Sequence, residues 1–258
     1  MEKPVTVLLG LGRTVGEAIV QRFLDEGHEV LAVDPNPKQL AELQKTVGDK
    51  AERLQSPIHS RLGLKNALSA AREAFGRIDH VVAIPRLAEP DLALSLDPAE
   101  FDDAMLETVR AAVEILRVFS SAMLEHRRDP GSSVERAQQV GSFTFVLSLA
   151  TLISQKGHFT QSVTQHAVFG VIKAAAVELA PLGIRTNAVI ALRPRSEDQE
   201  KWLKSRTPAG RAAIAEEIAE SALFLSQPSI SIMTGQAVVL DGGRQRLSGL
   251  TKFEDDEA

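Results

Sequence analysis

The sequence predicts an α/β fold with one doubly wound parallel sheet and helices on both faces. Short apolar runs, each about the length of a buried strand, alternate with segments whose apolar residues recur at helical spacing. No internal repeat and no linker interrupts this alternation, and 258 residues are enough to bury one substantial core. We therefore expect a single domain over residues 1–258.

The first elements carry the most specific pattern. Residues 5–9 form an apolar run of the buried parallel-strand kind, and the glycine-rich stretch 10–16 follows it directly. A helical pattern then leads to a second strand at 30–33, which ends in Asp34. Strand, glycine loop, helix, strand and terminal acid in this order are typical of a dinucleotide-binding unit. The candidate cofactor-binding residues are Gly10, Gly12, Arg13, Thr14, Gly16 and Asp34.

The same alternation continues to the carboxyl end of the chain. Helices are predicted at 38–47, 62–75, 98–127, 160–180 and 211–226, and strands at 78–84, 143–147, 185–190 and 236–240. Three segments lack such patterns and are expected to be a surface loop before residue 139, a mobile polar flap at 192–210 and an acidic, frayed tail at 250–258.

Composition excludes several classes of function. A net charge of −5 argues against binding to nucleic acid or to an anionic membrane surface. The chain has no cysteine, so it has no disulfide or thiolate metal site, and its six histidines are scattered, so we expect no metal. No signal peptide precedes the first strand, and no apolar run approaches the roughly 20 residues that span a bilayer. We expect a cytoplasmic protein without a membrane partner.

These motifs, together with several that maintain packing, resemble the short-chain dehydrogenase/reductase family over nearly the full chain. The resemblance rests on Gly10, Gly16, Asp34, the stretch 75–79, Ser148, 178–181, 183–188, 217–219, 234–235 and 241–243. It implies a Rossmann-type fold and hydride transfer between NAD(P) and a carbonyl or alcohol. It also implies a homodimer or homotetramer built on helices 98–127 and 160–180 and the last strand.

The residues that carry the family's chemistry are mostly replaced. The family's serine is present as Ser148, but its tyrosine, lysine and asparagine positions hold Gln161, Gln165 and Thr108. The chain contains no tyrosine at all. A glutamine amide has no proton to exchange near neutral pH and cannot act as a general acid. His158, three residues before Gln161, is the candidate substitute acid, and the alternative is an exposed loop histidine.

The cofactor positions are also altered. Thr14 replaces the middle glycine of the loop, and Thr14 with Glu17 matches a capping box, so intact dinucleotide binding and a self-capped helix are both open. Asp34 favours NAD over NADP, because a carboxylate repels a 2′-phosphate. Arg86 either enters the adenosine cleft or lies on the surface. Other positions that contact the cofactor in the family are replaced by Ala83, Ile84, Pro85 and Arg86, by Ser56 or Pro57, and by Ala191 and Leu192.

Two functional interpretations follow. In the first, the protein is a non-catalytic or strongly divergent member that binds a small molecule, or a partner subunit of the same family, in the inherited cleft. In the second, it is an NAD-dependent oxidoreductase with a rearranged route for the proton. In both interpretations we expect NAD binding to be weak.

Overall fold

The computed structural model describes residues 3–12, 14–127, 139–154, 156–192 and 197–247. Within these residues seven parallel strands form one sheet in the order β3-β2-β1-β4-β5-β6-β7, which confirms the predicted fold class. The strands are β1 (Val5–Leu9), β2 (Glu29–Asp34), β3 (Glu52–Gln55), β4 (His80–Ala83), β5 (Gly141–Ser148), β6 (Ile184–Ala191) and β7 (Ala237–Leu240). The apolar runs do not predict β3, because this edge strand has no buried residue and carries Glu, Arg and Gln.

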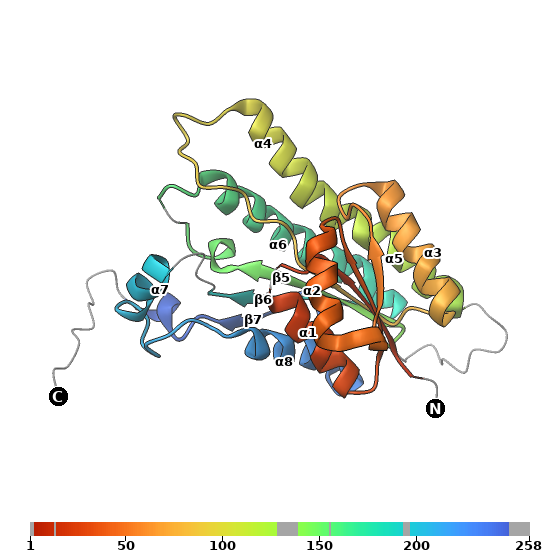
Figure 1. Cartoon of the computed structure of the whole chain (residues 1–258). Coiled ribbons are helices and arrows are strands. Elements are labelled where there is room, and N and C mark those ends of the chain that lie inside the picture. Colours follow the sequence, from red (N-terminus) through yellow and green to blue (C-terminus); the bar gives the residue numbers. More distant parts are fainter. Residues whose placement is uncertain (1–2, 13, 128–138, 155, 193–196, 248–258) are drawn as a thin grey trace.

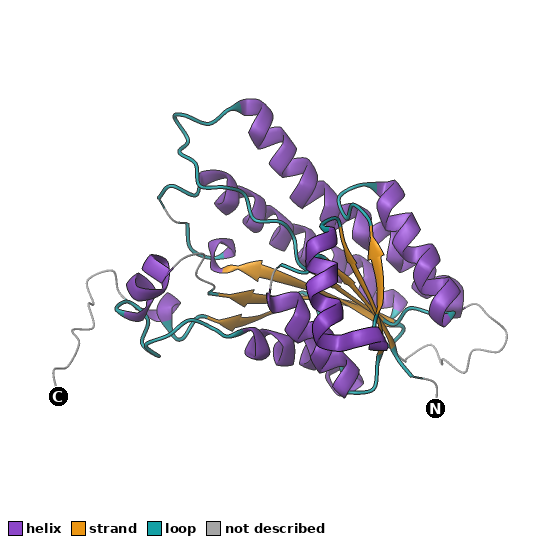
Figure 2. Ribbon diagram, in the orientation of Figure 1, coloured by secondary structure: helices purple, strands orange, loops and turns teal. Residues whose placement is uncertain are grey.

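Helices cover both faces of the sheet, as Figures 1 and 2 show. The helices are α1 (Thr14–Asp25), α2 (Pro37–Val47), α3 (Arg61–Phe75), α4 (Pro98–Met105), α5 (Ala111–Arg127), α6 (Phe159–Leu179), α7 (Glu197–Lys204) and α8 (Ala215–Ser226). One apolar core joins α1, α2 and α8 to one face of the sheet, and a second joins α3, α5 and α6 to the other. The two cores take alternate residues of the same strands, because successive side chains point to opposite faces.

Side-chain caps fix where several helices begin. The side-chain oxygen of Asn36 accepts from the Lys38 amide at the start of α2, and Ser60 accepts from the Gly63 amide at the start of α3. Asp97 caps α4 ahead of the proline at its first position. Each cap satisfies a backbone N–H that has no partner within the helix.

The helix predicted at 98–127 is interrupted by one wider turn. A π-helical segment, Leu106–Arg110, separates α4 from α5 and places Thr108 at its centre. The Ala111 amide donates to the carbonyls of both Leu106 and Thr108 there. Such insertions occur often at functional sites, and this one packs against α6.

The helix α6 is more apolar than the sequence analysis expected. The segment Phe159–Leu182 is long and apolar enough to cross a membrane by length and composition alone, which corrects the expectation that no such run exists. It packs on β6 of the sheet, however, and its buried face includes Thr164, Gln165 and Ile172. It is therefore the core helix of a globular domain, with a second face left exposed.

Polar side chains attach the last strand to the rest of the sheet. The fully buried Asn187 donates to the Met233 carbonyl at 2.8 Å and accepts from the Gln236 amide at 3.0 Å. The guanidinium of Arg185 bonds Gln139 and the Gln227 carbonyl, and burial lowers its pKa from 12.5 to about 10. These bonds set the position of β7 relative to β6.

The structure describes the three predicted irregular segments to different extents. Within the 192–210 segment the structure contains the helix α7, residues 193–196 lie outside the described residues, and the mobility of this segment stays a prediction. Most of the polar loop before residue 139 and all of the acidic tail at 250–258 also lie outside the described residues.

Candidate functional site

The serine and the two glutamines predicted to mark the site lie together at the carboxyl end of β5. Ser148 is the last residue of that strand, and α6 brings Gln161 and Gln165 against it, one helical turn apart. The Nε2 atom of Gln161 donates to the Ser148 hydroxyl oxygen over 3.1 Å. These three predicted site residues therefore lie together.

Gln165 is the more deeply buried of the two glutamines. It has no exposed surface, and its Oε1 atom accepts from the Ser148 backbone amide at 3.0 Å. Its Nε2 atom has no hydrogen-bond partner among the described residues. The Ser148 carbonyl accepts from the Thr151 hydroxyl at 2.7 Å, so the amide, the hydroxyl and the carbonyl of Ser148 are all bonded within the chain.

Thr108 and His158 are the two other predicted site residues. Thr108 is buried with 3% of its surface exposed, in the π-helical segment that packs against α6. His158 occupies the position just before α6, and its Nδ1 atom is buried without a partner among the described residues. The Ser148 hydroxyl is held by Gln161 rather than by this histidine. His158 is therefore close in sequence to the reacting positions but is not joined to them.

The glycine loop has the sharp backbone that a dinucleotide site requires, but it is crowded. Gly10 and Gly12 adopt φ values of +86° and +51°, which favour glycine. A Cβ atom on Gly12 would lie 2.8 Å from the side chain of Ile84, and one on Gly10 would lie 2.7 Å from the Ile84 carbonyl oxygen. Ile84 follows β4, at the point where the strand order reverses. Its side chain is 4% exposed and belongs to the apolar core that includes Leu11 and Val15.

The predicted capping box is not formed as expected. Thr14 is the first residue of α1, so the preceding cap position falls on Arg13, which lies outside the described residues. The loop is closed instead by a backbone bond from the Gly16 amide to the Leu11 carbonyl at 2.7 Å. The start of α1 is thus fixed by the backbone of the loop.

Asp34 is in place at the end of β2, but both of its oxygens are engaged. One accepts from the Leu11 amide at 2.7 Å and the other from the Asn36 amide at 2.8 Å. The residue is buried, with 5% of its surface exposed. Asp34 therefore ties the glycine loop to the turn after β2. A carboxylate oxygen has two lone pairs, so a ribose hydroxyl can still donate to it.

The remaining altered positions do not face a nucleotide. Arg86 forms a surface ion pair with Glu107 at 2.8 Å. Of its two interpretations, entry into the adenosine cleft or a place on the surface, the structure therefore favours the surface. The Ser56 hydroxyl donates to the Gly63 carbonyl, and Leu192 is part of the apolar core. A dinucleotide would thus contact the loop backbone and Asp34, but few of the other groups that bind it in the family.

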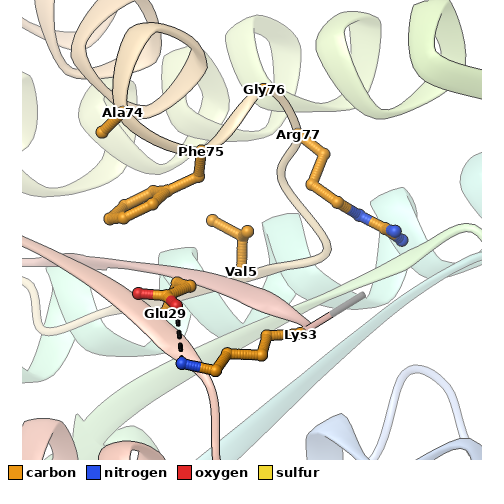
Figure 3. A pocket seen from close by; sticks show the side chains of 7 residues that line it. All are labelled: Lys3, Val5, Glu29, Ala74, Phe75, Gly76 and Arg77. Atoms are coloured by element: carbon orange, nitrogen blue, oxygen red, sulfur yellow. Dashed lines mark hydrogen bonds and ion pairs between the residues drawn. The ribbon is translucent and has the colours of Figure 1, made fainter. Parts of the chain in front are cut away.

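Two cavities help to place a ligand. One of about 360 Å³ lies between the glycine loop and the start of α2 and includes Leu11, Thr14 and Lys38 in its lining. Another of about 530 Å³ lies at the amino ends of β1 and β2 (Figure 3). Phe75 and Val5 form its apolar wall, and Lys3 pairs with Glu29 across its edge. Ligands of doubly wound sheets bind at the carboxyl ends of the strands, so the first cavity is the relevant one.

With this geometry established, comparison with known proteins is informative. The model of the enoyl-(acyl carrier protein) reductase family matches residues 10–245. The chain belongs to the short-chain dehydrogenase/reductase family. It is 26% identical to short-chain dehydrogenase reductase 3a of Arabidopsis thaliana, covering 94% of this chain and 95% of that protein. It is 28% identical to 3beta-hydroxysteroid dehydrogenase 2 of Eggerthella lenta, covering 92% and 93%.

A solved structure of this family supports the same conclusion. The crystal structure of 3-ketoacyl-(acyl carrier protein) reductase from Brucella melitensis, complexed with NADH, superposes with a TM-score of 0.84. The two sequences are 27% identical, and the match covers 94% of this chain and 98% of that one. The short-chain dehydrogenase/reductase fold therefore extends over most of this chain.

The sequence did not identify two residues that shape the site. Leu11 supplies the amide that holds one oxygen of Asp34, and Asn36 supplies the amide that holds the other. Backbone donors such as Leu11 leave no signal in side-chain identity.

Proposed function

We propose that this protein is a divergent short-chain dehydrogenase/reductase that binds a ligand in the inherited cleft without catalysing efficient hydride transfer. The observation that supports this most strongly is the hydrogen-bonded group of Ser148, Gln161 and Gln165. No side chain in that group can release a proton near neutral pH or carry a positive charge. Removal of a positioned general acid lowers a rate by about 10²–10⁴.

We further propose that NAD(H) binds weakly and is preferred over NADP(H). The backbone of the glycine loop and the carboxylate of Asp34 favour binding, and an acid in this position disfavours a 2′-phosphate. Glu17 in the lining of the cavity beside the loop opposes binding, because its carboxylate repels a pyrophosphate. The Brucella reductase structure contains NADH, which makes this nucleotide the first to test.

The test measures binding and turnover separately. Calorimetry and thermal shift with NAD, NADH, NADP and NADPH should give weak affinity for NAD(H) and less for NADP(H). The variant Glu17→Gln should strengthen NADH binding several-fold, because it removes a carboxylate from the lining of that cavity. Glu73→Gln removes the same charge on the exposed face of α3 and should leave NADH affinity unchanged.

Two results would contradict this proposal. One is tight binding of NADPH over NADH, which would mean that Asp34 does not face the ribose. The other is robust turnover of a carbonyl or alcohol by the purified protein, assayed as NADH oxidation across a broad substrate panel.

A second candidate is an NAD-dependent short-chain oxidoreductase of a carbonyl or alcohol substrate with a different proton donor. Family membership and the unpartnered Nδ1 atom of His158 favour it. If this function is correct, His158→Gln abolishes turnover. The control His166→Gln, whose ring contacts the Ser162 carbonyl on the same helix, retains turnover. Equal activity of both variants would exclude His158 as the donor.

We also propose that the protein forms a homodimer or homotetramer, or pairs with a related subunit. Exposed apolar side chains on the long helices support this, and they include Leu106, Val113 and Val177. A second apolar group surrounds the last strand and includes Phe224, Ile232 and Val239. Burial of apolar surface is the main driving force for association.

A further inference from the structure

A cavity of about 340 Å³ lies behind the site, between α4, the chain before it and the start of α6. In Figure 1 this chain runs from β4 to α4 past the first turn of α6. Thr108 and Thr160 form its inner wall, and both are buried with 3% of their surface exposed. Its volume is within the range that holds a small molecule.

The lining of this cavity is strongly acidic. The acidic side chains are Glu89, Asp91, Glu100, Asp103 and Glu107, and the one basic side chain that the lining contains is Arg86. Arg86 pairs with Glu107 at 2.8 Å, and their side chains are 69% and 33% exposed. The guanidinium is thus a mobile surface cation that partly neutralises a less exposed carboxylate. An external cation could take its place at modest energetic cost, since exposed ion pairs contribute about 0–1 kcal/mol.

A buried hydroxyl at the inner wall lacks a partner. The Oγ1 atom of Thr160 is buried and has no hydrogen bond to any described residue. The backbone amide of the same residue donates to both oxygens of Asp91, at 3.0 and 3.3 Å. Asp91 is therefore held in place with lone pairs to spare, beside a hydroxyl that requires a partner.

We propose that this cavity binds a small organic diamine. One ammonium group donates to Asp91 and to the Thr160 hydroxyl, and the other replaces Arg86 at Glu107. An ammonium group has three donors and no acceptor, which matches carboxylates and a free hydroxyl oxygen. The described residues contain no group of three side chains placed to hold a metal ion, so an organic cation fits better than a divalent one.

The test is calorimetry at low salt with 1,4-diaminobutane, compared with butylamine and 1,4-butanediol as probes. We expect the diamine to bind about fivefold more tightly than the monoamine, because a second charge pair contributes about 1 kcal/mol. The diol should not bind. Arg86→Ala should strengthen diamine binding about threefold by removing the internal competitor.

Matched variants distinguish a specific binding site from nonspecific attraction of a cation to an acidic surface. Asp103→Asn should weaken binding about threefold, and Asp102→Asn, one residue away but outside the lining, should not. Arg110→Ala removes the same charge as Arg86→Ala outside the lining and should have no effect. Thr160→Val should weaken diamine binding if it folds, and Asp103→Asn tests the site if it does not.

The proposal is overturned if butylamine and the diamine bind with equal affinity. It is also overturned if each control variant changes diamine affinity as much as the lining variant to which it is matched. These measurements need no nucleotide and no turnover. Their outcome is therefore independent of whether NAD(H) binds in the cleft.

Discussion

At the scale of single residues, internal hydrogen bonds join Ser148, Gln161 and Gln165. Gln165 is fully buried and receives the Ser148 amide, so it satisfies a backbone donor at the end of a central strand. A lysine at the same position would bring a charge into a place with no exposed surface. The two glutamines are thus part of the packing of the site.

We predict that Gln165→Lys lowers the free energy of unfolding by about 2–4 kcal/mol, alone or combined with Gln161→Tyr. The change leaves the Ser148 amide unpaired and buries an ammonium group without a carboxylate. Urea denaturation measures it, with Gln44→Lys on the exposed face of α2 as the control. A variant as stable as the parent protein would show that the cleft is open, and NADH oxidation by the double variant would show that the cofactor site is intact.

A second residue-scale prediction concerns the two buried histidines near the amino ends of the strands. Burial lowers the pKa of His80 from 6.5 to about 3, and burial also lowers the pKa of His28. Their rings lie 5.5 Å apart, with Asp79 and Glu26 opposing the shift at His28 and Arg22 adding to it. His28, Arg185 and Arg77 reinforce the shift at His80.

Both folded pKa values are below the unfolded value, so the stabilisation is complete above pH 6.5 and is lost as the pH falls. For His80 the loss should approach about 1.4 kcal/mol per pH unit between about pH 6 and pH 4. His80→Asn should flatten the dependence of the melting temperature on pH, and the exposed His59→Asn should not. Parallel curves for His80→Asn and the parent would contradict this assignment.

At the scale of elements, side chains determine how the last strand joins the sheet. β7 is an edge strand with no fully buried residue, so its apolar contacts alone hold it weakly. Asn187 compensates by bonding one carbonyl and one amide in the segment that leads into β7. The register of β7 therefore depends on the buried side-chain amide of Asn187.

We predict that Asn187→Leu lowers the free energy of unfolding by about 2–4 kcal/mol, because it leaves the Met233 carbonyl and the Gln236 amide without partners. Urea denaturation would measure this loss. Asn66→Leu on the exposed face of α3 should change stability by less than about 0.5 kcal/mol. Hydrogen exchange should also become faster in β7 of the Asn187 variant, and unchanged exchange there would refute its role in registration.

The elements were predicted to very different degrees. Central strands and amphipathic helices follow from apolar periodicity, because burial decides both. Apolar periodicity does not show β3, because an edge strand needs little burial, and the π-helical turn at Thr108 was missed because the apolar stripe continues through it. The positions of Ser148, Gln161 and Gln165 followed from spacing within the family. Their mutual hydrogen bonds required the three-dimensional structure.

At the scale of the whole molecule, the exposed face of α6 is the main apolar surface that no other part of the described chain covers. Val177 on this helix is 77% exposed, and Val113 on α5 is 46% exposed. The other face of α6 packs on the sheet. A helix that is apolar on both sides is usually covered on both sides.

We predict that the purified protein is dimeric or tetrameric and that Val177→Glu shifts it to a smaller species. Light scattering after size-exclusion chromatography measures this shift. Leu94→Glu, at a fully exposed residue of the chain before α4, changes charge equally and should keep the assembly intact. A monomeric parent protein, or a variant with unchanged mass, would argue against association through α6.

The hydrogen bond between Gln165 and the Ser148 amide also has an evolutionary consequence. Native proteins are stable by only about 5–15 kcal/mol, so a step that removes several kcal/mol is strongly disfavoured during sequence drift. Substitution by lysine at this position must pass through such a step, because the buried amide contact is lost. Gln165 is therefore entrenched: further mutation is channelled toward sequences that keep this contact.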